Sequence, residues 1–235
     1  MPEGLTVMEN PEKAHSVSLL NSPSVPQLWD SFYRTSFKRI FDLVLGLLLL
    51  PFIAPALLLL IVLIKIESKG PAIFKSERIG LGGKGFYIFK LRTMCVNAEE
   101  KLAEVLRQNE SLRCEWEENQ KLKNDPRVTR VGKIIRKLSL DELPQIFNIL
   151  KGEMSFVGPR PIVQNEVARY GRHFGKYKSV LPGVTGLWQI NGRNDTQYEE
   201  RIALDVKYTH ELNFNLDLKI IGKTIPVALL RKGAY

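Results

Sequence analysis

Cysteine and histidine are scarce in this chain of 235 residues. The two cysteines, Cys95 and Cys114, have neither the spacing of a metal site nor that of a thioredoxin-like redox motif. His173 and His210 have no metal-ligand partners at a useful spacing, so we interpret both as structural. The two cysteines are therefore interpreted as ordinary residues of a protein in a reducing compartment.

A secretory signal is also missing. The first 30 residues are rich in Ser, Pro, Asn and Glu, and they show no periodicity. The apolar segment begins late, and no small-residue cleavage site follows it. We expect residues 1–36 to form a mobile N-terminal tail.

Acidic residues are outnumbered, with 25 Asp and Glu against 34 Lys and Arg, which gives a formal net charge of +9. Charges balance over residues 1–39, so the whole excess lies in the rest of the chain. A basic domain favours an anionic partner such as lipid headgroups, a phosphorylated substrate or nucleic acid. No recognised nucleic-acid-binding module is present, so we expect no nucleic-acid partner.

The one long apolar segment spans residues 40–64. Its length permits a membrane-spanning helix, since about 20 residues cross a bilayer. Pro51 and Pro55 near its middle favour a kink. Cations flank both ends of the segment: Lys38, Arg39, Lys65 and Lys69. Because positive charge prefers the cytoplasmic side, a broken helix that enters and leaves by one face is as plausible as a kinked transmembrane anchor.

Asp42 lies one turn inside the apolar edge, where a charge is costly. We expect it to pair with a neighbouring cation such as Arg39.

Two alternating stretches, residues 72–79 and 86–91, are typical of strands. The connection Gly80–Gly85 contains a formal G-x-G-x-x-G pattern, but the dinucleotide-binding fingerprint requires a helix after it. A strand follows here, so the glycines predict a hairpin turn. Lys90 and Arg92 at the end of this hairpin could face an anion or form a solvated basic edge.

The remaining elements are predicted helices, which makes the fold α+β and mostly helical. Residues 97–122 form a charged amphipathic helix and residues 124–138 a basic one. The run 216–230 alternates apolar and cationic residues, which fits either a membrane-surface helix or a core helix.

Adjacent carboxylates, Asp141 and Glu142, stand at the predicted start of a helix. Ser139 and Glu142 have the capping-box spacing, and an apolar periodic run follows. A helix N-terminus favours an anion, either a carboxylate or a bound phosphate. On these residues alone, simple capping is the more common role.

Arg160 lies between two prolines, which should stiffen its loop. A preorganised guanidinium suits bidentate recognition of phosphate or carboxylate, although a structural salt bridge is also common. The segment 182–193 mixes turn residues with polar side chains and could bind a ligand or merely connect helices.

From about Phe37 to its end, the chain resembles the monotopic phosphoglycosyl transferases, which are bacterial polyprenyl-phosphate sugar-1-phosphate transferases. The motifs that carry the resemblance are Phe37–Asp42, Phe89–Met94, Leu138–Leu143, Lys151–Pro161 and Pro182–Arg193.

The resemblance implies a re-entrant membrane helix over residues 37–69 and a catalytic domain over residues 70–235 on the cytoplasmic face of the bacterial inner membrane. One departure is that the family's usual Ser-Pro break is Ala54-Pro55 here. The hydroxyl that would satisfy a freed carbonyl is absent, so the break must depend on Pro55 and on packing.

The resemblance also implies the chemistry. Asp141 would be the nucleophile toward a UDP-sugar, and undecaprenyl phosphate would be the acceptor. Glu142 would assist as a metal ligand or proton carrier, with Mg²⁺ held by Asp141 and Glu142. Arg136 and Arg160 match family arginines expected to hold phosphate oxygens.

Lys90, Arg92 and Arg193 are weaker candidates for phosphate binding. The ending Arg231–Tyr235 and the loop motifs resemble those of galactose- and glucose-phosphate transferases of exopolysaccharide and O-antigen pathways. We expect UDP-galactose narrowly over UDP-glucose, with N-acetylated sugars as a further alternative. A homodimer is compatible with the charged helix. The alternative is a membrane-anchored, non-catalytic module that binds anions or lipids.

Overall fold

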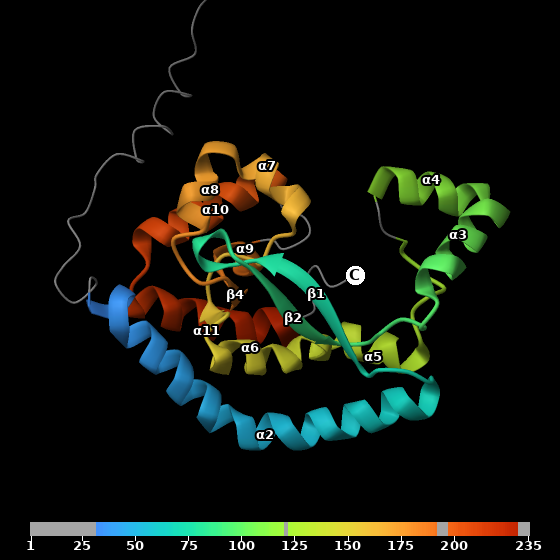
Figure 1. The fold of residues 1–235 in the computed structure, drawn as a ribbon, viewed down its shortest axis with the longest axis horizontal. Coiled ribbons are helices and arrows are strands. Elements are labelled where there is room, and N and C mark those ends of the chain that lie inside the picture. The colour runs from blue at the N-terminus through green and yellow to red at the C-terminus, as the bar shows by residue number, and fades with distance from the viewer. Residues whose placement is uncertain (1–31, 120–121, 192–196, 230–235) are drawn as a thin grey trace, which may run out of the picture.

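The computed structural model describes residues 32–119, 122–191 and 197–229 (Figure 1). It is mostly helical, with two small two-stranded sheets, so the predicted α+β class with a small β-hairpin is confirmed. The helices are α2 (Lys38–Glu67), α3 (Ala98–Gln108), α4 (Glu110–Asn119), α5 (Arg130–Lys137), α6 (Ile146–Lys151), α7 (Val167–Tyr170), α8 (Phe174–Tyr177), α9 (Leu187–Ile190), α10 (Tyr198–Glu211) and α11 (Phe214–Leu229). The strands are β1 (Ile73–Ile79), β2 (Gly85–Leu91), β3 (Ser155–Val157) and β4 (Gly183–Thr185).

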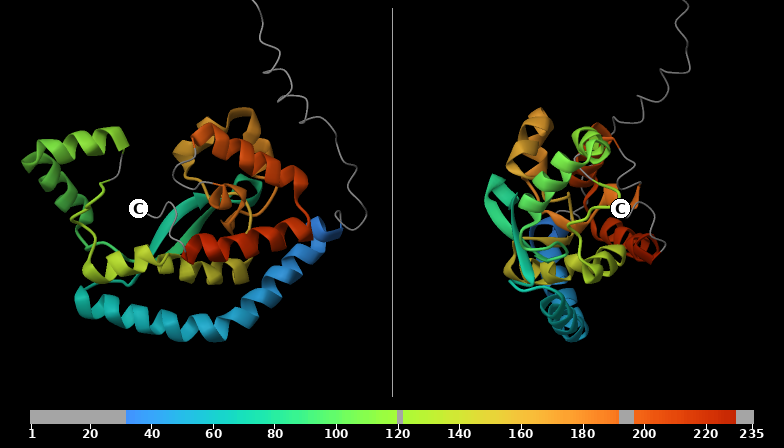
Figure 2. Two further views of the ribbon diagram at one scale, coloured as in Figure 1. Left: turned by 180° about the vertical axis from the view of Figure 1, so that it is seen from behind. Right: turned by 90° about the vertical axis from the view of Figure 1, so that its right-hand side faces the viewer.

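Helix α2 runs along one side of the molecule and changes direction near its middle (Figures 1 and 2). Pro51 and Pro55 lie inside it, where each removes a backbone N–H that the helix would use. The part of the helix before the prolines contacts β3 and α6, and the part after them packs against Ile135 of α5. Among the described residues it is the one helix long and apolar enough to cross a membrane, by length and composition.

The side of α2 that faces away from the domain carries large exposed apolar side chains. They are Ile40, Val44, Leu47, Leu48, Phe52, Leu58, Leu59, Val62, Leu63 and Ile66. Only 11% of the most apolar 18-residue window of the helix is buried. A surface of this size and composition marks a site of contact with a membrane or another protein.

The residues just before α2 are folded, contrary to the prediction that the tail extends to residue 36. Tyr33–Phe37 form a single π-helical turn that continues into α2. Tyr33 is fully buried, and its hydroxyl donates a hydrogen bond of 2.6 Å to Asp217. Burial of this aromatic side chain against α11 explains why the ordered domain begins before residue 37.

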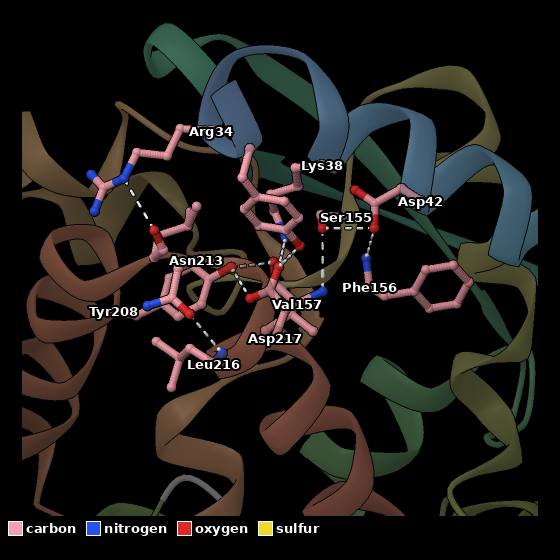
Figure 3. Close-up of polar contacts among 12 residues, drawn as sticks. Arg34, Lys38, Asp42, Ser155, Phe156, Val157, Tyr208, Asn213, Leu216 and Asp217 are labelled. Carbon is pink, nitrogen blue, oxygen red and sulfur yellow. Dashed lines mark hydrogen bonds and ion pairs between the residues drawn. The ribbon is translucent and has the colours of Figure 1, made fainter. Parts of the chain in front are cut away.

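The neighbouring cation whose charge acts on Asp42 is Lys38 and not Arg39. Asp42 is fully buried and accepts hydrogen bonds from the Ser155 hydroxyl and from the backbone N–H of Phe156 (Figure 3). Arg39 donates instead to the Leu150 carbonyl, over 2.9 Å, at the C-terminus of α6. Unpaired carbonyls at a helix end attract a cation, which accounts for the position of this guanidinium.

Strands β1 and β2 form the predicted hairpin, with Ile73 opposite Leu91 and Ile79 opposite Gly85. Gly82 and Gly83 in the turn have φ values of +69° and +80°, which glycine adopts without strain. No helix follows the glycines, so the rejection of a dinucleotide-binding fingerprint is confirmed.

The single charged helix predicted over residues 97–122 is in fact two helices, α3 and α4. Asn109 between them is extended, with φ −136° and ψ 105°, and its side chain accepts a hydrogen bond from the backbone of Leu112. An Asn side chain that accepts from a nearby backbone N–H replaces a helical hydrogen bond, so Asn109 favours an interruption between the two helices. The α3–α4 pair projects from the body of the molecule (Figures 1 and 2).

Strands β3 and β4 pair in parallel, with Ser155 opposite Gly183 and Val157 opposite Thr185. The sequence predicted only loops here, because strands of three residues show no periodicity. The backbones approach closely, since a Cβ at Gly183 would lie 2.1 Å from the nitrogen of Gly158. Helix α11 packs behind this sheet with Ile220 fully buried, which favours the core-helix interpretation of the C-terminal run.

Candidate active site

A cavity of about 1040 Å³ opens between the hairpin, α5, the segment after α5 and the β3–β4 sheet. Its polar lining includes both predicted catalytic carboxylates and most of the predicted phosphate-binding cations. These residues are Lys90, Arg92, Arg136, Asp141, Glu142 and Arg160. The apolar lining includes Ile53 of α2, so the cavity extends to the bent region of that helix.

Asp141 and Glu142 lie in a 3₁₀ helix, Leu140–Gln145. The predicted capping box is wrong, because Ser139 has a left-handed backbone with φ +54° and its side chain caps nothing. Pro144 sits inside the 3₁₀ helix, where it lacks the backbone N–H that another residue would donate within the helix. The two carboxylates therefore stand in the first turn of a short, tight helix and not at a regular α-helix N-terminus.

Lys90 of β2 lies directly against this carboxylate pair. Its Nζ is 3.3 Å from Oδ2 of Asp141 and 2.9 Å from Oε1 of Glu142. Burial raises the pKa of Asp141 and repulsion from Glu142 adds to this, while Lys90 opposes both. For Lys90, burial lowers the pKa, but attraction to Glu142 and Asp141 outweighs it and the net pKa is raised. The net pKa of Asp141 is still raised, so Lys90 offsets only part of the cost of burying the ionised carboxylate.

Arg136 and Arg160 reach the cavity from different elements. Arg136 of α5 donates through Nε to the Thr93 hydroxyl over 2.8 Å, which orients its guanidinium. Arg160 is exposed, and its guanidinium stacks on the Trp188 ring at 5.4 Å. Stacking leaves the N–H groups in the guanidinium plane available for a ligand.

Arg92, a weaker candidate for phosphate binding, lines the cavity and is also hydrogen-bonded to the end of α2. Its guanidinium donates to the backbone carbonyls of Ser68 and Lys69, over 2.9 and 3.1 Å, and to the Ser68 hydroxyl. Two of its three nitrogens thus fix the connection between α2 and β1. Arg193 lies outside the described residues. Ala54 and Pro55 lie within α2.

Two residues of the site were missed by sequence reasoning. Arg78 of β1 lines the cavity, but a basic residue in an alternating strand gives no signal that separates it from a solvated edge. Asp205 of α10 is buried, accepts a hydrogen bond of 2.7 Å from the Tyr170 hydroxyl and is hydrogen-bonded by the backbone of Arg160. It therefore braces the loop that carries Arg160.

The carboxylate pair is also the candidate metal site. No cluster of three or more His, Cys, Asp or Glu side chains occurs among the described residues. Mg²⁺ usually binds one or two carboxylates and completes its coordination with water and substrate phosphates. Asp141 and Glu142, adjacent in one cavity with phosphate-binding cations, fit that requirement.

Comparison with known proteins gives a consistent set of relatives. A family model described as bacterial sugar transferase matches residues 33–231. A UDP-galactose-lipid carrier transferase of Erwinia amylovora is 48% identical over 198 residues, covering 84% of this chain and 41% of that protein. The exopolysaccharide production protein ExoY of Sinorhizobium fredii is 44% identical, covering 84% of this chain and 88% of that protein.

A UDP-glucose:undecaprenyl-phosphate glucose-1-phosphate transferase of Caulobacter vibrioides is 41% identical over 207 residues, covering 84% of this chain and 72% of that protein. The chain therefore spans less than half of the Erwinia relative and most of the other two.

Proposed function

Because the chain belongs to the bacterial sugar transferase family, we propose that it transfers a sugar 1-phosphate from a UDP-sugar to undecaprenyl phosphate. The observation that supports this most directly is the cluster of Asp141, Glu142 and Lys90 in a cavity with Arg136 and Arg160. Phosphoryl transfer depends mainly on positioning and on neutralising negative charge, which such a cluster supplies.

In the proposed first step, a carboxylate oxygen of Asp141 attacks the phosphorus nearest the sugar. A bond forms between Asp141 and phosphorus, the bond from phosphorus to the oxygen of UMP breaks, and UMP leaves with that electron pair. In the second step a phosphate oxygen of undecaprenyl phosphate attacks the same phosphorus and releases the Asp141 carboxylate. Splitting one transfer into two is a common use of a carboxylate nucleophile.

The cations have separate roles in this scheme. Lys90 favours the ionised form of Asp141 and aligns it through its 3.3 Å contact. Arg136 and Arg160 bind phosphate oxygens and neutralise charge on the donor. Glu142 serves as a second metal ligand or proton carrier. A bound Mg²⁺ would supply charge neutralisation at the phosphates, held by Asp141 and Glu142.

We further propose that α2 is embedded in the cytoplasmic membrane and re-entrant, with the catalytic domain on the cytoplasmic face. The exposed apolar face, the bend at Pro51 and Pro55, and the cations at both ends support this arrangement. It would place the soluble donor and the lipid acceptor at one interface. In this arrangement the end of the cavity lined by Ile53 would lie close to the membrane surface, where the phosphate of the acceptor lipid is located.

The donor sugar is proposed to be galactose, with glucose as the second choice. The names of the Erwinia and Caulobacter relatives specify UDP-galactose and UDP-glucose respectively, and the identity is higher to the first.

Release of UMP from a panel of UDP-sugars tests the function. The protein in nanodiscs is assayed with and without undecaprenyl phosphate, and with Mg²⁺ or a chelator. Turnover that needs the lipid, the metal and one sugar supports the proposal and identifies the donor. If folded protein releases no UMP from any UDP-sugar, the non-catalytic anion- or lipid-binding module becomes the better explanation.

A further inference from the structure

Arg78 and Arg160 both line the cavity. Arg78 is half-buried on β1. Among the described residues its one hydrogen bond goes from NH1 to the carbonyl of the preceding residue, Glu77, over 3.0 Å. Within the described part of the chain, neither arginine forms an ion pair within 4 Å of a carboxylate. Each therefore has donor groups available to a ligand.

The two arginines also repel each other. Burial lowers the pKa of Arg78, and the charge of Arg160 lowers it further. Glu166 opposes this effect, but its carboxylate already contacts Arg201, at 3.5 Å, and the Tyr198 hydroxyl, at 3.1 Å. Holding like charges together in a partly buried site is unfavourable unless an anion binds between them.

The register of the hairpin separates Arg78 from Lys90, because Lys90 lies opposite Phe74 and Arg78 is four residues farther along β1. Arg136 interacts with Asp141, and Lys90 contacts Asp141 and Glu142. The charge of Arg160 acts on both Lys90 and Arg78, since it lowers the pKa of each. Four residues of strand span about 13 Å, so Arg78 lies that far along the sheet from Lys90, which contacts both carboxylates.

A nucleoside diphosphate sugar carries two phosphates in series, and only the one nearest the sugar must reach Asp141. We propose that Arg78, together with Arg160, binds the phosphate on the nucleoside side of the donor, leaving Lys90 and Arg136 for the transferred phosphate. This inference rests on the proposed function. That phosphate gains negative charge when UMP departs, so Arg78 contributes to binding the donor and to stabilising the leaving group.

The experiment compares Arg78→Gln and Arg78→Lys with wild-type protein in nanodiscs. For Arg78→Gln we expect the KM for the UDP-sugar and the Kd for UDP to rise about 10- to 100-fold, because charge-assisted hydrogen bonds are lost. Arg78→Lys should recover part of the loss, since a lysine keeps the charge but not the planar fork. The KM for undecaprenyl phosphate should stay unchanged.

Lys75→Gln is the matched control. Lys75 lies on the same strand, but its Nζ faces the Phe89 ring at 5.9 Å and it does not line the cavity. A folded Arg78→Gln protein, judged by its thermal unfolding, that binds UDP as wild type does would overturn the inference. A change in the acceptor KM alone would also overturn it.

UDP binding separates this inference from the function it rests on. If wild-type protein binds UDP through Arg78 but releases no UMP from any UDP-sugar, the proposed transferase reaction fails and the binding role of Arg78 stands. If wild-type protein turns over and the two Arg78 variants match it, only the role of Arg78 fails.

Discussion

Oδ1 of Asp42 in helix α2 accepts a hydrogen bond of 3.0 Å from the hydroxyl of Ser155, the first residue of β3 (Figure 3). One turn earlier in α2, Lys38 pairs with Asp217, which also accepts from the hydroxyls of Tyr33 and Tyr208. The start of α2 is therefore fixed to the strand that leads into the Arg160 loop. These contacts connect α2, with its exposed apolar face, to the strand next to the candidate active site.

Replacing Lys38 with Met should destabilise the protein strongly. Asp217 would remain fully buried without its cation, and breaking a buried pair in this way costs about 3–5 kcal/mol. Denaturant unfolding in detergent measures the loss. Lys207→Met removes an exposed pair with Glu211 at 3.9 Å and should cost less than about 1 kcal/mol. Equal losses in the two variants would contradict a structural role for the buried pair.

Asp141→Asn should abolish formation of a covalent phosphosugar adduct and lower turnover by about 10³-fold or more, because the amide is a poor nucleophile. Intact-protein mass spectrometry after mixing with a UDP-sugar detects the adduct, and UMP release measures turnover. Glu211→Gln, an exposed change of the same kind on α10, is the control and should behave as wild type. Unchanged turnover in Asp141→Asn would remove Asp141 from the nucleophile role.

Asp205 should make stability depend on pH. Burial raises the pKa of Asp205 to about 7 in the folded protein, with the Tyr170 hydroxyl, Arg201 and Arg160 opposing the rise. In the unfolded chain the group ionises near its usual pKa of about 4. Folding therefore favours the protonated form, and the contribution of Asp205 to stability is greatest below about pH 4 and is lost as pH rises toward about 7.

Asp205→Asn removes this titration while leaving an oxygen to accept from Tyr170. Between about pH 4 and about pH 7, the free energy of unfolding of the wild-type protein should fall relative to that of the variant by on the order of 1.4 kcal/mol per pH unit. Unfolding free energies measured for both proteins at intervals from pH 4 to 8 provide the test. Parallel curves would show that Asp205 is already ionised in the folded state at low pH.

Cysteine labelling in cells tests the re-entrant arrangement. With Cys95 replaced by serine, Ser31→Cys should label from the same side of the membrane as the exposed native Cys114, and only after permeabilisation. A spanning α2 would place the two positions on opposite sides, so labelling of position 31 in intact cells would contradict the proposal. A protein that has Cys114 as its single cysteine provides the reference.

The sequence alone determined features that depend on near neighbours. The glycines between two alternating stretches specified the β1–β2 hairpin, and the two prolines predicted a bend in the apolar helix, because turn and helix geometry are decided within a few residues. The adjacent carboxylates Asp141 and Glu142 were visible in the sequence, but the family resemblance, and not local geometry, assigned them to the candidate site.

Only the tertiary structure decided which side chains meet across long stretches of chain. Lys90 contacts Asp141, a carboxylate 51 residues away. Arg92 donates to the end of α2, and Arg39 donates to the end of α6 and not to Asp42. Several cations in a basic chain could serve each anion equally well by local criteria. The choice among them depends on how the hairpin, α2 and α6 pack, and burial decides that packing over the whole domain.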